Sequence, residues 1–296
     1  MGKLVLIDGN AILHRAFHAL PPLTTKRGEP INAVYGLVSM LLRVIQDLKP
    51  THITVAFDEK APTFRHKALP TYQAQRPPTH EDLSSQFEKA KDFLRACGIP
   101  VYSKPGYEAD DVIGTIAEKS KEDVVIITGD RDQLQLINDK IKLYMPISGL
   151  INAKLFGEKE TIERMGVPPG KIDDFKALVG DASDNYSGVP GIGPKTAITL
   201  LERYGTFENI YKNIDKIQGT VADKLKKGEE KGRLSKKLAT IVRDVPIKID
   251  YEAMEKWKVN SPEVLALFAE FGFKTLTERV KTVGKEIDKE KQGELF

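Results

Sequence analysis

Three short runs of consecutive apolar residues most constrain how this chain can fold. They are KLVLI at 3–7, ITVAF at 53–57 and VVIIT at 124–128. Strands with continuous rather than alternating hydrophobicity are buried on both faces, which is typical of parallel sheets covered by helices. Helical patterns separate the runs, at 32–48, 81–97 and 108–120. This alternation of strands and helices predicts a doubly wound α/β domain.

The second half of the chain has a different pattern. From about residue 157 the apolar repeats are helical and shorter, and Gly and Pro interrupt them. We therefore expect an α/β domain at 1–156, a helical domain at 157–280 and a flexible charged tail at 281–296. A chain of 296 residues is long enough for two domains of ordinary size.

The cysteine content and the apolar runs exclude several classes of protein. The single cysteine, Cys97, cannot form an intrachain disulfide, which fits a reducing compartment. It has no basic neighbour that would activate a thiol, so we expect a buried packing residue. No apolar segment approaches the roughly 20 residues of a membrane span, and the first run ends at Asp8, too short for a signal peptide. We expect a cytoplasmic protein without membrane contact.

An aspartate follows each apolar run: Asp8, Asp58 and Asp130. In parallel α/β sheets, ligands bind beyond the carboxyl ends of the strands. Any one of these acids could be a turn former or a helix cap, but their repeated position after strands favours a joint function. With the acids of GYEADDVIG, GDRD and VGDASDN, the candidate metal ligands are nine carboxylates: Asp8, Asp58, Glu108, Asp110, Asp111, Asp130, Asp132, Asp181 and Asp184.

Clustered carboxylates predict a site for hard cations. Oxygen ligands without His or Cys select Mg²⁺ or Mn²⁺. His14 and His18 lie four residues apart, but no Cys or third His accompanies them, so we expect a structural or DNA-facing pair and no zinc site. Two divalent ions would offset much of the negative charge, and they suit in-line displacement at phosphorus. The acids therefore predict phosphodiester hydrolysis.

A basic segment follows Asp58 directly. Residues 60–80 contain no acid, and they interleave basic and aromatic side chains: Lys60, Phe64, Arg65, Lys67, Tyr72 and Arg76. This composition suits a single-stranded nucleic acid, whose backbone is anionic and whose bases stack. A solvated loop is the alternative, and the position next to Asp58 favours nucleic-acid binding.

A second nucleic-acid motif is SGVPGIGPKTAITLLERYG at 187–205. Gly191 and Gly193 indicate a tight hairpin, and Pro194 suits the first position of a helix whose amides, with Lys195, would hold a phosphate. A Walker loop is excluded because Pro194 separates Gly193 from Lys195 and no strand precedes the motif. The pattern predicts a helix-hairpin-helix element that contacts duplex backbone.

Residues 212–248 contain eleven Lys or Arg against five Asp or Glu. A basic helical surface of this kind would follow duplex phosphates. A charged helix that is only solvated is the alternative.

Five motifs together resemble the 5′-nuclease (flap endonuclease) superfamily: LVLIDGN, VAFDEKAPTFRH, GYEADDVIGT, TGDRDQLQL and VGDASDNYSGVPGIGPKTA. The resemblance extends through about residue 280 and is strongest to the bacterial 5′→3′ exonuclease, which occurs free-standing or as the N-terminal domain of DNA polymerase I. It implies a PIN-like core with a parallel sheet, a helical arch at about 60–90 and a helix-hairpin-helix element. It also implies cleavage of 5′ flaps and 5′ ends at single-strand/duplex junctions, with RNA primer and flap removal in DNA replication and repair.

The resemblance also implies roles for individual residues. Ligands of a first Mg²⁺ would be Asp8, Asp58, Glu108 and Asp110. Ligands of a second Mg²⁺ would be Asp130, Asp132, Asp181 and Asp184. Asp111 would be an accessory acid, and Arg76 would join Asp8, Asp58, Asp110, Asp130 and Asp132 in catalysis. DNA contacts would come from Arg65, Lys67, Tyr72, Gln73, Arg76, Gly191, Gly193, Lys195 and Thr196. A K⁺ ion would bind at the hairpin.

One departure and one tail motif stand out. Relatives commonly carry Lys at the position of Gln73, where it faces the scissile phosphate, so we expect Gln73→Lys to raise the cleavage rate. The sequence QGELF at 292–296 resembles the peptide by which bacterial replication proteins bind the sliding clamp. A disordered tail is the alternative. If residue 296 is the natural end, the protein is a free-standing monomeric enzyme, and otherwise a polymerase I nuclease domain.

Two other function classes fit the sequence less well. A non-catalytic protein that binds DNA junctions would keep the fold and lose metal ligands, but all nine acids are present. A phosphatase of the haloacid dehalogenase type would need an aspartate two positions after Asp8, and Asn10 stands there. Nuclease activity therefore remains the leading expectation.

Overall fold

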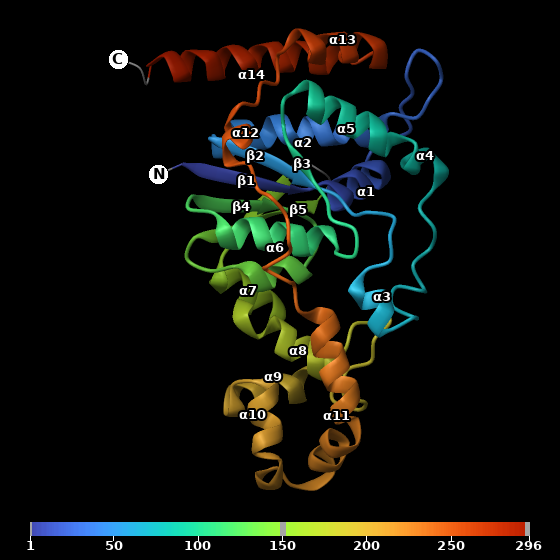
Figure 1. The fold of residues 1–296 in the computed structure, drawn as a ribbon, viewed down its shortest axis with the longest axis vertical. Coiled ribbons are helices and arrows are strands. Elements are labelled where there is room, and N and C mark those ends of the chain that lie inside the picture. Colours follow the sequence, from blue (N-terminus) through green and yellow to red (C-terminus); the bar gives the residue numbers. More distant parts are fainter. Residues whose placement is uncertain (1, 149–151, 294–296) are drawn as a thin grey trace.

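A computed structural model describes residues 2–148 and 152–293 of the chain (Figure 1). Its centre is a six-stranded sheet with the order β3-β2-β1-β4-β5-β6. The strands are β1 Lys3–Asp8, β2 His52–Ala56, β3 Val101–Tyr102, β4 Asp123–Ile127, β5 Ile141–Ser148 and β6 Asn152–Phe156. Strands β1 to β5 run parallel and β6 pairs antiparallel with β5. The predicted parallel α/β sheet is confirmed, with an antiparallel edge that was not predicted.

The central strands are buried on both faces, as their continuous hydrophobicity predicts. In β1, Val5 and Ile7 pack on one side of the sheet, whereas Leu4 and Leu6 pack on the other. All four side chains are at most 1 % exposed. Because neighbouring parallel strands are in register with β1, the residues after each strand reach the same edge of the sheet.

Helices cover both faces of the sheet (Figure 1). On one face lie α1 Gly9–Ala19, α2 Asn32–Leu48, α5 Gln86–Ala96, α13 Pro262–Phe271 and α14 Lys274–Gly293. On the other lies α6 Ala109–Lys119. Two short helices, α3 Phe64–Ala68 and α4 Glu81–Ser84, lie in the long connection between β2 and α5. Cys97 is buried and unpaired behind α5, which confirms its packing role.

The helical region lies beyond α6, at the end of the molecule away from α14 (Figure 1). It consists of α7 Glu158–Met165, α8 Ile172–Val179, α9 Pro194–Tyr204, α10 Phe207–Lys212 and α11 Gly219–Ala239. Within the described residues, 3-10 turns lie at Asp132–Leu136, Pro169–Lys171 and Ile214–Lys216. The apolar side chains of α8, α9 and α10 are continuous with the core under the sheet, so this region is joined to the α/β layer by packing.

After α11 the chain returns to the α/β layer. Residues 240–250 pass α6, where the Val242 amide reaches Asp111, and α12 Tyr251–Glu255 contacts β2. Helices α13 and α14 then pack on α5 and α2, with Phe268, Val280 and Val283 buried. This differs from the expected single helical domain at 157–280. The expected flexible tail at 281–296 is likewise wrong for 281–293, which continue α14.

No helix within the described part of the chain is long and apolar enough to cross a membrane.

Candidate active site

A pocket of about 630 Å³ opens at the carboxyl edge of the sheet. Seven of the nine predicted acids line it: Asp8, Asp58, Glu108, Asp110, Asp130, Asp132 and Asp184. We call this cavity the acid pocket. Asp181 lies beside it with its carboxylate near Asp132, whereas Asp111 points elsewhere. The acids predicted to converge from the strand ends therefore do so.

Local structure fixes the first acids. Asp8 ends β1 and caps α1, because its Oδ1 accepts a hydrogen bond from the Ala11 amide at 2.9 Å. Asp58 lies two residues after β2, and its Oδ1 accepts from the Ala109 amide at 2.7 Å. Helix α6 thus begins beside Asp58, and Asp110 in its first turn reaches the same pocket. Helix N-termini favour such negative charge.

A buried glutamine, which the sequence did not reveal as a site residue, joins two of these acids. Gln133 Nε2 donates to Asp8 Oδ2 at 3.1 Å and to Asp110 Oδ1 at 2.7 Å. Thr128 Oγ1 also donates to Asp8, at 2.8 Å. The signal available in the sequence was a polar residue at a core position in DQLQL, since Gln133 is fully buried.

Four acids at one end of the pocket have no basic partner. We call Asp8, Asp58, Asp110 and Asp130 the open set. Within the described residues, no Lys, Arg or His nitrogen lies within 4.0 Å of their carboxylates. Burial, and then repulsion from Asp58 and Asp130, raises the pKa of Asp8 to about 7. Burial, and then Asp130 and Asp8, raises the pKa of Asp110 as well. No cation of the described residues therefore contacts the open set directly, and Arg76 and His14 act on Asp58 only from a distance.

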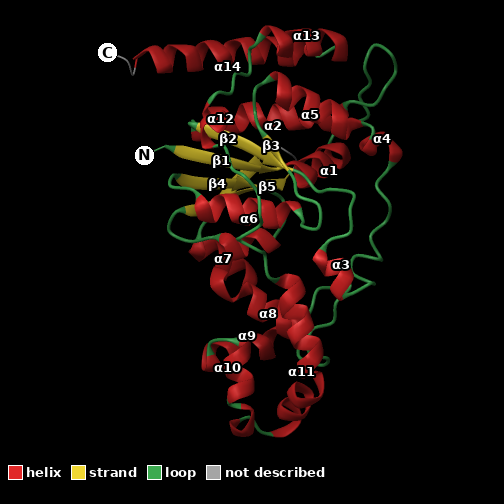
Figure 2. Cartoon of the chain, in the orientation of Figure 1, coloured by secondary structure: helices red, strands yellow, loops and turns green. Residues whose placement is uncertain are grey.

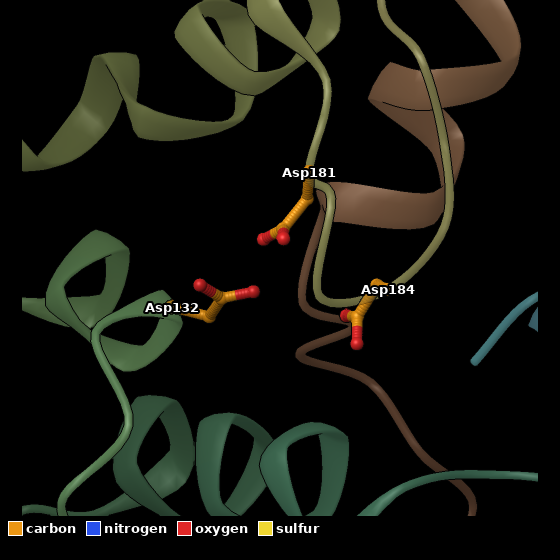
Figure 3. A group of neighbouring side chains, drawn as sticks. All are labelled: Asp132, Asp181 and Asp184. Carbon is orange, nitrogen blue, oxygen red and sulfur yellow. The ribbon is translucent and has the colours of Figure 1, made fainter. Parts of the chain in front are cut away.

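Three acids at the other end are neutralised by the protein itself. We call Asp132, Asp181 and Asp184 the paired set (Figure 3). One carboxylate oxygen of each lies within 4.8 Å of one oxygen of the other two. Lys176 Nζ donates to Asp132 and, at 2.5 Å, to Asp181. Arg76 Nη2 donates to Asp184 Oδ1 at 2.5 Å. Lys176 was not predicted, although a lysine inside the apolar stretch FKALV was a usable signal.

The pKa values of the paired set reflect these cations. Burial raises the pKa of Asp132 to about 6, although Lys176 acts in the opposite direction. At Asp181, burial also favours the neutral acid, but Lys176 and Ser183 outweigh it, so the pKa is lowered. Burial of Lys176 favours its neutral form, yet Asp132 and other neighbours keep its pKa raised and the ammonium charged.

Asp111 and Arg65 form a buried ion pair rather than a metal ligand and a DNA contact. Arg65 Nη1 and Nη2 donate to the two oxygens of Asp111 at 2.7 and 2.9 Å. The Arg65 side chain is 3 % exposed and the Asp111 side chain 0 %. Asp111 also accepts from the amides of Glu108 and Val242, so its oxygens are satisfied. The predictions of a metal role for Asp111 and a DNA role for Arg65 are corrected by this geometry.

Glu108 lies between the open set and this ion pair. Its carboxylate lines the acid pocket, and Arg65 Nη1 lies 3.4 Å from its Oε2. Burial raises the pKa of Glu108 to about 7, with Arg65 acting in the opposite direction. A partly neutralised, pocket-facing carboxylate can still serve as a cation ligand.

The segment after Asp58 crosses the pocket. Residues 69–80 contain no helix, so the expected helical arch is reduced to α3, α4 and the loop between them (Figure 2). The Tyr72 hydroxyl donates to the Asp184 carboxylate at 3.1 Å. The backbone N–H of Gln73 donates to the backbone carbonyl of Asp184, also at 3.1 Å. Tyr72 is 4 % exposed and cannot stack on a base here, which corrects that expectation. Gln73 and Arg76 line the pocket, and Lys67 is exposed on α3.

The second predicted DNA element lies outside the acid pocket. Gly191 has a φ of +82° in the turn before α9, which favours glycine, and Gly193 caps α9, whose first residue is Pro194. Lys195 is exposed and Thr196 half-buried in the first turn of α9. The Gly191 carbonyl accepts from Lys224 Nζ of α11 at 3.1 Å. The predicted turn and helix start are present in the structure.

Family models match the chain in two adjacent segments. Residues 3–166 match the 5′-3′ exonuclease N-terminal resolvase-like domain, and residues 167–263 match the 5′-3′ exonuclease C-terminal SAM fold. DNA polymerase I of Bacillus caldotenax is 40% identical over 291 residues, which are 97% of this chain and 33% of that protein. DNA polymerase I of Bacillus subtilis (strain 168) is 40% identical over 282 residues, 94% of this chain and 32% of that protein. The chain thus spans about a third of these relatives' length.

Solved structures share the fold at lower sequence identity. The bacteriophage T5 D15 flap endonuclease, in a complex with DNA and metal ions, has a TM-score of 0.64 and 21% identity, with 96% of this chain and 98% of that chain covered. Flap endonuclease-1 from Methanococcus jannaschii has a TM-score of 0.64 and 19% identity, with 98% and 94% covered.

Proposed function

The chain belongs to the 5′-3′ exonuclease family of hydrolytic nucleases, and from that premise we propose that it is a Mg²⁺-dependent 5′→3′ exonuclease and 5′-flap endonuclease. Its substrate would be DNA with a 5′ flap or 5′ end at a single-strand/duplex junction, during primer and flap removal in replication and repair. The observation that carries the proposal is the open set, four carboxylates that line one pocket and that no basic side chain among the described residues contacts. One chain supplies every acid, so a monomer would suffice.

The donor set fits two hard cations. Every candidate ligand is a carboxylate oxygen, which Mg²⁺ and Mn²⁺ prefer. Asp8, Asp58, Glu108 and Asp110 would hold one ion, and Asp130, Asp132, Asp181 and Asp184 the other. Such ions supply an activated water and stabilise the leaving oxygen at phosphorus. Asp111 is not part of this proposal, because Arg65 and two amides already satisfy it.

The chain's own residues would position the phosphate. Arg76 is half exposed and lines the pocket, so its guanidinium could release Asp184 and meet the scissile phosphate. Gln73 lies beside it and would donate a hydrogen bond where a lysine would donate a charge. Lys67 would contact the single strand on the outer side of α3. Gln133 would keep Asp110 oriented, because its side-chain amide donates to both Asp110 and Asp8.

The turn before α9 would bind the duplex. Its Gly191 and Gly193 allow close approach of a phosphate, and Lys195 and Thr196 of the first helical turn would hold it. We include a K⁺ ion at this turn in the proposal. The Gly191 carbonyl would have to leave Lys224 Nζ to bind that ion, so activity in K⁺ compared with Na⁺ tests this part.

Cleavage of a labelled 5′-flap substrate tests the function. We expect cutting in Mg²⁺, binding without cutting in EDTA, and restored cutting when Mg²⁺ is added back. A matched substrate without a junction should be cut more slowly. Binding with no cutting in Mg²⁺ or Mn²⁺ would overturn the nuclease proposal and favour a protein that only binds junctions.

A sliding clamp remains a proposed partner through 292–296. Residues 294–296 of this motif lie outside the described residues. If the motif binds the clamp, deletion of 292–296 should abolish clamp affinity while flap cleavage without the clamp is retained. Unchanged affinity after the deletion would exclude this partner.

A further inference from the structure

A second pocket lies beside the acid pocket and has the opposite charge. It measures about 200 Å³ and is lined by three arginines and by apolar side chains: Arg15, Arg131, Arg164, Met145, Pro146, Ile147 and Phe156, with Gly129 between them. We call it the arginine pocket. No carboxylate belongs to its described lining.

One short loop joins the two pockets. Asp130 and Asp132 face the acid pocket, whereas Gly129 and Arg131 line the arginine pocket. Successive residues of the loop after β4 therefore point alternately to the two sides. A phosphate chain that occupies the acid pocket would pass directly beside Arg131.

Two of the three arginines have no matching acid in the described part of the chain. Arg131 and Arg164 are exposed, and neither pairs with a carboxylate of the described residues. Arg164 lies over the Phe156 ring, with its guanidinium carbon 5.7 Å from the ring centre. Burial, and then the charge of Arg131, lowers the pKa of Arg164. The Arg15 guanidinium faces Gly129, where a side-chain carbon would come within 3.8 Å of Arg15 Nη1. Like charges gathered around an apolar floor suit an anion with several acceptor oxygens.

The sheet order gives a path for that anion. The loop at 60–80 follows β2, the open set lies at the ends of β1, β2 and β4, and the arginine pocket lies at β5, β6 and α7. In Figure 1, α7 lies between the sheet and the region of α8 to α11. A nucleic acid that extends from the 60–80 loop through the acid pocket would reach the arginine pocket on its far side.

We propose that the arginine pocket binds a backbone phosphodiester of the substrate DNA on the duplex side of the cut. This inference rests on the proposed nuclease function. The bound group is the phosphate class, and its source is DNA rather than free phosphate because the loop 129–132 connects the pocket to the acids. Ile147, which is 52% exposed at the rim, would contact the sugar face of the same nucleotide.

Binding of junction DNA in EDTA, followed by fluorescence anisotropy over a range of salt concentrations, tests the pocket independently of cleavage. Arg164→Gln should weaken binding by about fivefold to tenfold and reduce the slope of log Kd against log salt by about one, as expected for one lost phosphate contact. Arg95→Gln is the matched control, because Arg95 is exposed, pairs with Asp92 on α5, and does not line either pocket. Thermal melting would verify that both variants are folded.

Neutral methylphosphonate linkages, moved one position at a time along both strands on the duplex side, identify the contacted phosphate. At one position the neutral linkage should weaken wild-type binding and have no further effect on Arg164→Gln. If no position shows this coupling, the proposal is wrong. If inorganic phosphate raises the melting temperature of the wild type but not of Arg164→Gln, with no coupled DNA position, the pocket serves free phosphate instead. If the wild type binds junctions with the coupled phosphate but never cuts, only the nuclease proposal fails.

Discussion

The acids at the two ends of the acid pocket carry the same charge and are neutralised in different ways. In the paired set, Lys176 and Arg76 already contact Asp132, Asp181 and Asp184. In the open set no basic side chain does so, and burial raises the pKa of Asp8 to about 7. The carboxylates that still need a cation are therefore those of the open set. A divalent ion should therefore bind there first, and a second ion must compete with Lys176.

The largest expected effect comes from removing an acid of the open set. Asp110→Ala should reduce single-turnover flap cleavage on the order of a thousandfold or more, because a ligand of the first ion is lost. DNA binding in EDTA should be unchanged or tighter, since negative charge near phosphate is removed. A rate within tenfold of the wild type would show that the open set does not hold the catalytic ion.

The neighbouring acid should behave as a structural residue. Asp111→Ala leaves Arg65 charged and buried without its partner, so the free energy of unfolding in urea should fall by about 3–5 kcal/mol. The double variant Arg65→Met/Asp111→Leu should recover part of this loss, because it removes the unpaired charge but leaves the Glu108 and Val242 amides without their acceptor. A folded, fully stable Asp111→Ala that has lost cleavage would instead return Asp111 to the metal site.

Lys176 offers a way to remove the difference between the two ends. Lys176→Met frees Asp132 and Asp181, so the second of two Mn²⁺ binding events measured by calorimetry should tighten by roughly tenfold. The first event should be unchanged, because Lys176 does not contact the open set. Equal changes in both events would mean that the two ends are not distinct.

Asp8 of the open set and the neighbouring Glu108 should also make metal-free stability depend on pH. Asp8 and Glu108 have pKa values of about 7 in the folded chain, against about 4 when unfolded. Between these values the folded chain holds more protons, so stability falls as pH rises from about 5 to 8. In EDTA the melting temperature should fall by a few degrees, roughly, and Mg²⁺ should restore it most at high pH. A melting temperature that rises over this range would contradict the pKa values.

The smallest effect is expected at Gln73, which lines the acid pocket. Gln73→Lys adds a positive charge to the pocket lining and should raise the single-turnover rate severalfold. Gln73→Met, of similar length and without charge, is the control. A loss of rate in the lysine variant would show that added charge competes with the metals.

Much of this arrangement was predictable from the sequence because it follows from strand ends. Apolar runs before Asp8, Asp58 and Asp130 predicted both the parallel sheet and the edge where the acids meet. Strands β5 and β6 were not predicted. Pro146 interrupts the apolar pattern of β5, and β6, with the sequence NAKLF, is an edge strand whose side chains are mostly exposed. Such edges need not be apolar.

The division of labour between adjacent acids was less predictable. Asp110 and Asp111 follow each other in one helical turn, so spacing alone cannot tell which one faces the pocket. The answer depends on Arg65 and on the Val242 amide, which is 131 residues distant in sequence. Gln133 and Lys176 were missed for the same reason, because only the fold brings them to the carboxylates.

The position of α13 and α14 has a consequence for the order in which the protein is made. These helices, at 262–293, pack on α2 and α5, which the ribosome synthesises some two hundred residues earlier. Until then, the apolar face of α2 lacks Val280, Val283 and Phe268 as neighbours. A nascent chain that carries every acid of the pocket would therefore still expose apolar surface, and it should need chaperone protection until α14 emerges.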